Sequence, residues 1–187
     1  MYKNTPKPQE ITQILNGGGV VIFPTETLYG LGCDATNPQA LLKIYQIKSR
    51  QIGKAFPIVV KDFNMLADYA QFTPEQKRVM VKAKQLTTFI LKAKNLSPLA
   101  AVKHTAAFRI AKHRWIKELF RHFDKPIVAT SANVSGKDPL RDPRDYKEMF
   151  KKTAELIDAV IHAGINKKTK GSRIVDLTKK PYKIVRQ

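Results

Sequence analysis

Four short polar segments carry side chains that could bind an anionic ligand. Each lies beside an apolar run, and they are residues 24–33 (PTETLYGLGC), 48–50 (KSR), 130–136 (TSANVSG) and 171–173 (GSR). Hydroxyl, amide and cationic groups donate hydrogen bonds to phosphate and ribose oxygens. The glycines of residues 24–33 allow the backbone to approach a ligand closely. This combination predicts a binding site for a nucleotide or a phosphate.

Each segment taken alone also has an ordinary structural explanation. Residues 24–33 could be a turn into the next strand, and the cations of residues 48–50 suit the C-terminal end of a helix dipole. An Asx or Ser/Thr turn would account for residues 130–136 equally well. The functional interpretation therefore depends on the fold bringing the segments together.

The elements that would position these segments are strands and helices intermixed along the chain. Capping residues and apolar periodicity predict helices near residues 11–15, 37–47, 62–69, 73–81 and 115–123. Short apolar, β-branched runs predict strands at residues 20–23, 56–60, 87–91, 107–110, 126–129, 157–161, 174–177 and 182–185.

This order of elements predicts an α/β fold, with residues 1–187 forming a single domain around one twisted, mixed sheet flanked by helices. Several strands follow one another too closely for every connection to be a helical crossover, so antiparallel neighbours are expected. Open α/β sheets usually bind ligands at the ends of their strands. The four polar segments stand at such ends.

Charge is the outlying feature of the composition. The chain has 34 lysines and arginines against 15 aspartates and glutamates, a net charge of +19. Such a charge attracts polyanions, although lysines scattered over the whole surface would give the same value. No apolar run approaches the ~20 residues that a membrane span needs, and the N-terminus does not resemble a secretory signal. We therefore expect a cytoplasmic protein without membrane contact.

Several other catalytic classes do not fit the sequence. It lacks the Gly-x4-Gly-Lys-Ser/Thr loop of P-loop ATPases, and Gly17 to Gly19 lack the spacing of a dinucleotide fingerprint. The only cysteine, Cys33, is expected to pack in the interior rather than act as a nucleophile. No metal site made by protein side chains is predicted, because metal-ligand spacing is missing among His104, His113, His122 and His162.

Taken together, the four segments resemble the YrdC-like family of threonylcarbamoyl-adenylate synthases. Residues 24–32 are similar to its Pro-Thr-Glu-Thr-x-Tyr-Gly-Leu-Gly segment, residues 48–50 to its Lys-x-Arg, and residues 130–136 to its Thr-Ser-Ala-Asn-x-Ser-Gly. Arg109 matches the arginine of a family strand, and Arg186 matches an arginine near the end of the catalytic domain. The resemblance implies the YrdC-like fold with a basic concave groove, in the short form without an added C-terminal domain.

The resemblance implies a nucleotidyltransferase that makes L-threonylcarbamoyladenylate and pyrophosphate from L-threonine, bicarbonate and ATP. This product serves the threonylcarbamoyladenosine modification of tRNA, so proteins that transfer the threonylcarbamoyl group are the expected downstream partners. ATP would be a substrate, with Mg²⁺ on its triphosphate.

Nine residues are carried over by the resemblance. Lys48 and Arg50 are expected to be catalytic, and both side chains are expected to end in solvent or ligand. For Tyr29, a packing role is as plausible as a place in the threonine pocket. The expected ATP-binding residues are Lys48, Arg50, Ser131, Asn133, Ser172 and Arg186, and the expected threonine-binding residues are Thr25, Arg109 and Tyr29.

The sequence also departs from the family pattern. Gln51 replaces a proline, Arg173 replaces a threonine, and residues 82–86 (KAKQL) stand where a Trp-Pro-Gly-Pro-like turn is common. Two rival interpretations therefore remain: a non-catalytic protein that binds tRNA or double-stranded RNA, and a YciO-like paralogue with another activity or none. RNA backbone binding needs positive charge but not this set of small polar groups, and the Ser-Ala-Asn pattern disfavours the paralogue.

Overall fold

Helices and strands are intermixed along the chain, as the sequence predicted. The computed structural model describes residues 6–54, 56–165 and 171–186. The helices are α1 (Pro8–Asn16), α2 (Pro38–Ile47), α3 (Phe63–Tyr69), α4 (Pro74–Lys82), α5 (Arg114–Leu119) and α6 (Tyr146–Phe150), with 3-10 turns at Pro143–Asp145 and Lys151–Leu156. The strands are β1 (Val21–Pro24), β2 (Tyr29–Gly32), β3 (Pro57–Val60), β4 (Ala70–Gln71), β5 (Thr87–Ala93), β6 (Thr105–Ile110), β7 (Ile127–Val128), β8 (Thr130–Ser131), β9 (Ala159–Val160), β10 (Arg173–Asp176) and β11 (Lys183–Arg186).

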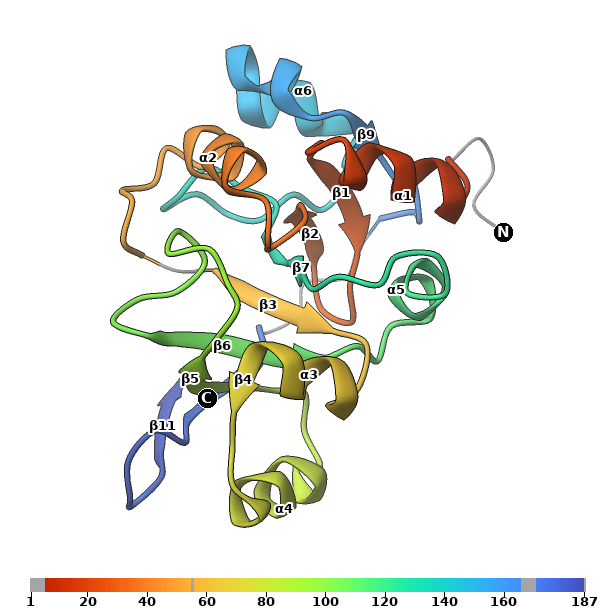
Figure 1. The fold of residues 1–187 in the computed structure, drawn as a ribbon. Helices are drawn as coiled ribbons and strands as arrows, with labels where there is room; N and C mark the ends of the chain where they lie inside the picture. The colour runs from red at the N-terminus through yellow and green to blue at the C-terminus, as the bar shows by residue number, and fades with distance from the viewer. Residues whose placement is uncertain (1–5, 55, 166–170, 187) are drawn as a thin grey trace.

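The strands form two mixed sheets instead of the single sheet that the sequence predicted. The smaller sheet has the order β8-β2-β1-β9, and the larger has the order β11-β10-β5-β6-β3-β7, with β4 paired to β5. Figure 1 shows α1, α2 and α6 with the smaller sheet, and α3 and α4 with the larger one. The α/β class and the flanking helices are confirmed.

Local sequence explains where most helices begin. The side chain of Asn37 accepts hydrogen bonds from the backbone of Gln39 and Ala40 at the start of α2. Thr73 and Gln76 form a reciprocal capping box at the start of α4. Helix α5 ends at Leu119, earlier than predicted, because the following residues continue in tighter turns.

A seam between β2 and β7 joins the two sheets. The backbone N–H of Val128 donates to Cys33 O at 2.9 Å. Gly32 makes this approach possible, because a Cβ at that position would lie 2.1 Å from Val128 O. Cys33 itself is buried and burial raises the pKa of its thiol, which confirms the packing role predicted for it.

At one end of the larger sheet, the pairing between β5 and β6 stops before the two strands end. Their antiparallel pairing reaches Phe89 and Phe108 at this end, while both strands continue beyond it. There, Thr87 and Thr88 pair with β10, whereas Arg109 pairs with β3. The side chain of Arg109 therefore emerges from β6 beside the point where the sheet divides.

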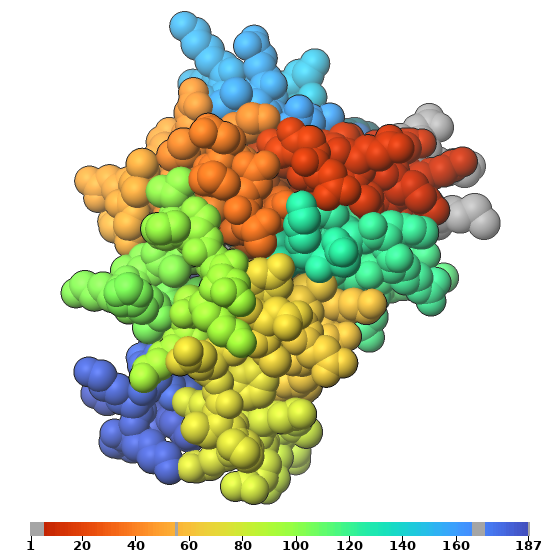
Figure 2. Space-filling model, viewed as in Figure 1, coloured from red at the N-terminus to blue at the C-terminus, as the bar shows by residue number. Residues whose placement is uncertain are grey.

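The C-terminal part of the described chain packs beside α4, as the blue and yellow regions of Figure 2 show. The Gln76 side chain donates to Leu177 O at 2.7 Å, and Lys180 forms an ion pair with Glu75 at 2.6 Å. These contacts fix the connection between β10 and β11 against α4, while β10 joins the larger sheet by pairing with β5. Within the described ranges, no helix combines the length and the apolar character needed to cross a bilayer.

Candidate functional site

A polar cavity of about 470 Å³ is lined by residues of both sheets and of the loops that follow their strands. Its polar lining consists of three arginines and several hydroxyls, and its apolar lining comes from strands of the larger sheet and from loops. Seven of the nine predicted site residues border it: Thr25, Tyr29, Arg50, Arg109, Ser131, Ser172 and Arg186. The four polar segments of the sequence thus meet around one space.

Lys48 lies behind this wall and not in it. Its side chain is buried, with 2% of the residue exposed, and its ammonium donates to Ser131 O at 2.6 Å, Asn133 O at 2.8 Å and Asn133 Oδ1 at 2.9 Å. The prediction that Lys48 ends in solvent or ligand is therefore wrong. Three protein oxygens replace the water that the ammonium loses, which is what makes its burial tolerable.

The electrostatic setting of Lys48 follows from this burial. Desolvation, and then the nearby positive charge of Arg50, lower the pKa of Lys48 to about 7. No carboxylate accepts from its ammonium among the described residues. Because this pKa is close to neutral pH, an anion that enters the adjoining cavity would shift Lys48 toward its protonated, charged form.

Asn133 completes the support of the loop after β8. Its Oδ1 accepts from Ser131 Oγ at 2.6 Å as well as from Lys48, and its Nδ2 donates to Lys137 O at 2.6 Å. Like Lys48, Asn133 does not border the cavity in this structure. The two residues hold the loop in shape, so that Ser131 is presented at the cavity wall.

The turn between β1 and β2 forms another part of the wall. The Thr25 hydroxyl donates to Leu28 O at 2.6 Å and accepts from the N–H groups of Thr27 and Leu28. This hydroxyl therefore closes the turn. Tyr29 is fully buried, with its hydroxyl donating to Gly164 O at 2.7 Å and accepting from Ala163 N at 2.9 Å. It packs in the wall of the cavity and also borders it, so a place in the threonine pocket stays a prediction.

Arg109 reaches the cavity beside a residue that the sequence analysis did not select. Glu26 Oε2 lies 3.5 Å from Arg109 Nη2, and Glu26 Oε1 accepts from the backbone N–H groups of Lys112 and His113 at 2.9 and 2.7 Å. Burial raises the pKa of Glu26, but Arg109 and these N–H groups outweigh it and lower the pKa overall. Glu26 is therefore ionised and holds Arg109 and the start of α5 in place.

Ser172 and Arg186 form one hydrogen-bonded unit in the wall of the cavity. Arg186 donates to Ser172 O from Nε at 3.0 Å and from Nη2 at 2.7 Å. Ser172 Oγ forms a hydrogen bond of 2.8 Å with Thr88 Oγ1. Gly171 allows the guanidinium to lie close, since a Cβ there would be 3.0 Å from Arg186 Nη2. Strands β10 and β11 thus place a cation and a hydroxyl together.

Arg50 approaches the cavity from the end of α2. Its guanidinium carbon lies 5.0 Å from the ring centroid of Phe56, a cation–π distance that favours one side-chain position. With Arg109 and Arg186 it gives the cavity three guanidinium groups from three distant parts of the chain. Such an arrangement can bind an elongated anion with several charged groups.

The side chains that line the cavity offer few ligands for a metal ion. The described residues that line the cavity include no aspartate or glutamate, and no cluster of three potential metal-ligating side chains occurs in the described part of the chain. A magnesium ion in this cavity would take its oxygen ligands mainly from the bound phosphates and water. This fits a metal that arrives with a nucleotide.

Comparison with known proteins supports the resemblance seen in the sequence. The Sua5/YciO/YrdC family model, described as telomere recombination, matches residues 13–187. The structure is similar to P. abyssi Sua5 complexed with L-threonine, with a TM-score of 0.84, 27% identity and coverage of 96% of this chain and 53% of that one. The chain therefore spans about half the length of that Sua5 protein.

Two further solved structures are informative. E. coli YciO has a TM-score of 0.84 and 26% identity, with 96% of this chain and 88% of that chain covered. HypF in a phosphate- and nucleotide-bound form has a TM-score of 0.82 at 19% identity, over 97% of this chain and 29% of that one, which shows a shared fold alone. Because the family model extends over nearly all of the sequence, the chain belongs to the Sua5/YciO/YrdC family.

Proposed function

We propose that the polar cavity binds ATP and L-threonine together and that the protein forms L-threonylcarbamoyladenylate and pyrophosphate. The observation that carries the proposal is the meeting of three arginines and several hydroxyls in one cavity of about 470 Å³. This volume lies within the range of small-molecule sites, roughly 300–1,000 Å³. The similarity to a Sua5 protein complexed with L-threonine supports the choice of amino acid.

The reaction joins three anionic or weakly reactive partners. The threonine amine attacks the carbon of bicarbonate and loses a proton, water leaves, and the product is a carbamate. A carbamate oxygen then attacks the α-phosphorus of ATP, and pyrophosphate leaves with the bond electrons. No covalent enzyme intermediate is required, so catalysis reduces to positioning and to charge stabilisation.

Each part of the cavity suits one of these tasks. Arg50 and the Ser172–Arg186 unit would contact the nucleotide and its phosphates, with Mg²⁺ carried by the triphosphate. Arg109, steadied by Glu26, would bind the threonine carboxylate in a bidentate manner. Ser131 would contact the nucleotide. Lys48 and Asn133 would hold its loop, and Lys48 would add positive charge from behind the wall.

Pyrophosphate release from ATP tests the proposal. The wild type should release pyrophosphate only when threonine and bicarbonate are both present. Arg50→Gln should reduce release by about a hundredfold or more, because it removes a cation from the reacting phosphates. The control is Arg121→Gln, which changes an arginine whose side chain is 72% exposed and pairs with Glu118 on the surface. Release that ignores threonine, or that survives Arg50→Gln, would contradict the proposal.

A second candidate is an activity like that of YciO proteins. The structure matches E. coli YciO as closely as it matches the Sua5 protein, with a TM-score of 0.84 for both and identities of 26% and 27%. The same assay distinguishes the two, because a YciO-like protein without synthase activity would not couple pyrophosphate release to threonine.

As a synthase in the cytoplasm, the protein would pass its adenylate to proteins that modify tRNA, and the charge of +19 suits work near RNA.

A further inference from the structure

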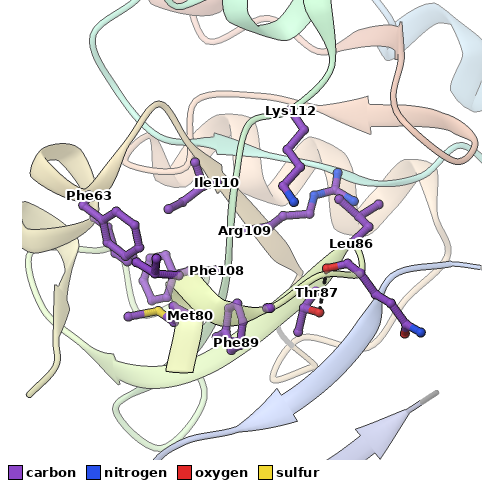
Figure 3. A pocket seen from close by; sticks show the side chains of 13 residues that line it. Phe63, Met80, Leu86, Thr87, Phe89, Phe108, Arg109, Ile110 and Lys112 are labelled. Carbon is purple, nitrogen blue, oxygen red and sulfur yellow. Dashed lines mark hydrogen bonds between the residues drawn. The ribbon is translucent and has the colours of Figure 1, made fainter. Parts of the chain in front are cut away.

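A second cavity, called here the apolar pocket, lies beneath α3 and α4. It encloses about 280 Å³, and its walls are mostly hydrocarbon. Figure 3 shows Phe63, Met80, Phe89 and Phe108 gathered around it. The further lining residues include Leu66, Val81, Ala83, Leu86 and Ile110.

The apolar pocket and the polar cavity lie on opposite faces of the larger sheet. Side chains alternate along β6, so that Phe108 and Ile110 line the apolar pocket whereas Ala107 lines the polar cavity. Arg109 borders both spaces. It does so because β5 and β6 separate beside it, which lets its side chain reach the gap between the two faces.

One end of the apolar pocket is cationic. In Figure 3 the nitrogen atoms of Arg109 and Lys112 lie at the end away from Phe63 and Met80. The Arg109 side chain is only 8% exposed, and its Nε has no hydrogen-bond acceptor among the described residues. A buried donor of this kind is costly unless something accepts from it.

The charged side chains at this end of the apolar pocket have a net positive charge that an anion could balance. Arg109 and Lys112 contribute two positive charges, Arg186 adds positive charge that acts on Arg109 from the polar cavity, and Glu26 contributes one negative charge. Burial, opposed by Glu26, lowers the pKa of the adjacent His113, so this imidazole is neutral at pH 7. Positive charge therefore exceeds negative charge at this end of the apolar pocket, where Arg109 also has an unused guanidinium donor.

We propose that the apolar pocket binds a small monocarboxylate with an unbranched or aromatic hydrocarbon body. The hydrocarbon lies among Phe63, Met80 and Phe89, and the carboxylate accepts from Arg109 Nε and Lys112 Nζ. A volume of about 280 Å³ holds roughly nine water-sized groups at ~30 Å³ each, which corresponds to a medium-chain or phenyl-substituted acid. A free phosphate would leave the hydrocarbon wall unused.

Octanoate is the probe for this site, with octan-1-ol as its uncharged counterpart. A ligand-observed NMR titration of the full chain at pH 7, without ATP or threonine, should show saturable binding of octanoate and weaker binding of octanol by at least about threefold. These conditions separate this proposal from the proposed synthase activity. Octanol binding as strongly as octanoate would refute the role of the cations, and no binding of either would refute the site.

Two variants test the location. Lys112→Gln should weaken octanoate binding by about threefold to tenfold, whereas Lys117→Gln, on the exposed side of α5, should leave it unchanged. Ala83→Phe places a ring in the apolar pocket at a half-buried position and should abolish the binding of both probes. Octanoate binding that Lys112→Gln leaves unchanged would overturn the proposal, even if Ala83→Phe fails to fold.

Discussion

Lys48→Met tests the claim that Lys48 supports the loop after β8. Methionine has a similar length, but it leaves Asn133 O without a donor. Ser131 O loses one of its two donors and keeps the N–H of Asn133, and Asn133 Oδ1 keeps its bond from Ser131 Oγ. Each orphaned buried acceptor costs about 1–3 kcal/mol, and removing a buried charge gives part of this back. With one acceptor orphaned and a second hydrogen bond lost, the expected loss in the free energy of unfolding is about 2 kcal/mol at pH 7.

Urea denaturation measures this loss, and Lys43→Met is its matched control. Lys43 lies on the same helix and makes one hydrogen bond, to Gly18 O at 3.0 Å, so its replacement should cost only about 1 kcal/mol. Both variants should keep the wild-type m-value, which reports the surface exposed on unfolding. Equal losses for the two variants would refute the role assigned to Lys48.

The same pair of proteins gives a pH test. The pKa of Lys48 is about 7 in the folded protein against 10.5 for an ordinary lysine. Between these values the unfolded chain binds more protons at this residue, so the wild type gains stability as pH rises, by about 1.4 kcal/mol per unit. The stability difference between wild type and Lys48→Met should therefore widen from pH 7 to pH 9. A constant difference would show that the ammonium stays charged throughout.

Two further substitutions probe the surroundings of the polar cavity. Gly32→Ala should lower the free energy of unfolding by about 3 kcal/mol, since the added Cβ would lie 2.1 Å from Val128 O. A melting temperature near that of the wild type would contradict the close contact between β2 and β7. Glu26→Gln should raise the KM for threonine about threefold to tenfold with a smaller effect on kcat, because Arg109 loses the carboxylate that steadies it. An unchanged KM in steady-state assays would show that Glu26 does not position Arg109.

The sequence predicted the elements whose signals are local. The caps at Asn37 and Thr73, and the buried apolar run of β1, produced the expected helices and strand. The gathering of residues 24–33, 48–50, 130–136 and 171–173 around one space also followed the expectation that ligand sites lie at strand ends. Their roles in binding ATP and threonine stay predictions.

The features that the sequence did not predict depend on distant contacts. Strand β2 was overlooked because its YGLG sequence has little strand propensity, and it forms because β1 and β8 pair with it. The burial of Lys48 depends on oxygens more than 80 residues away, at Ser131 and Asn133. Glu26 could have been found from its place between Thr25 and Thr27, but its partner Arg109 is distant in the sequence.

The central claim is that one cavity brings threonine, bicarbonate-derived carbon and ATP together. It is tested most directly by incubating the protein with ATP, Mg²⁺, threonine and ¹³C-labelled bicarbonate, followed by rapid mass spectrometry of the nucleotides. We expect an adenylate that contains both threonine and the labelled carbon, reduced by about a hundredfold or more when Arg50→Gln replaces the wild type. Nucleotide products that never contain threonine or the label, at any enzyme concentration, would contradict it.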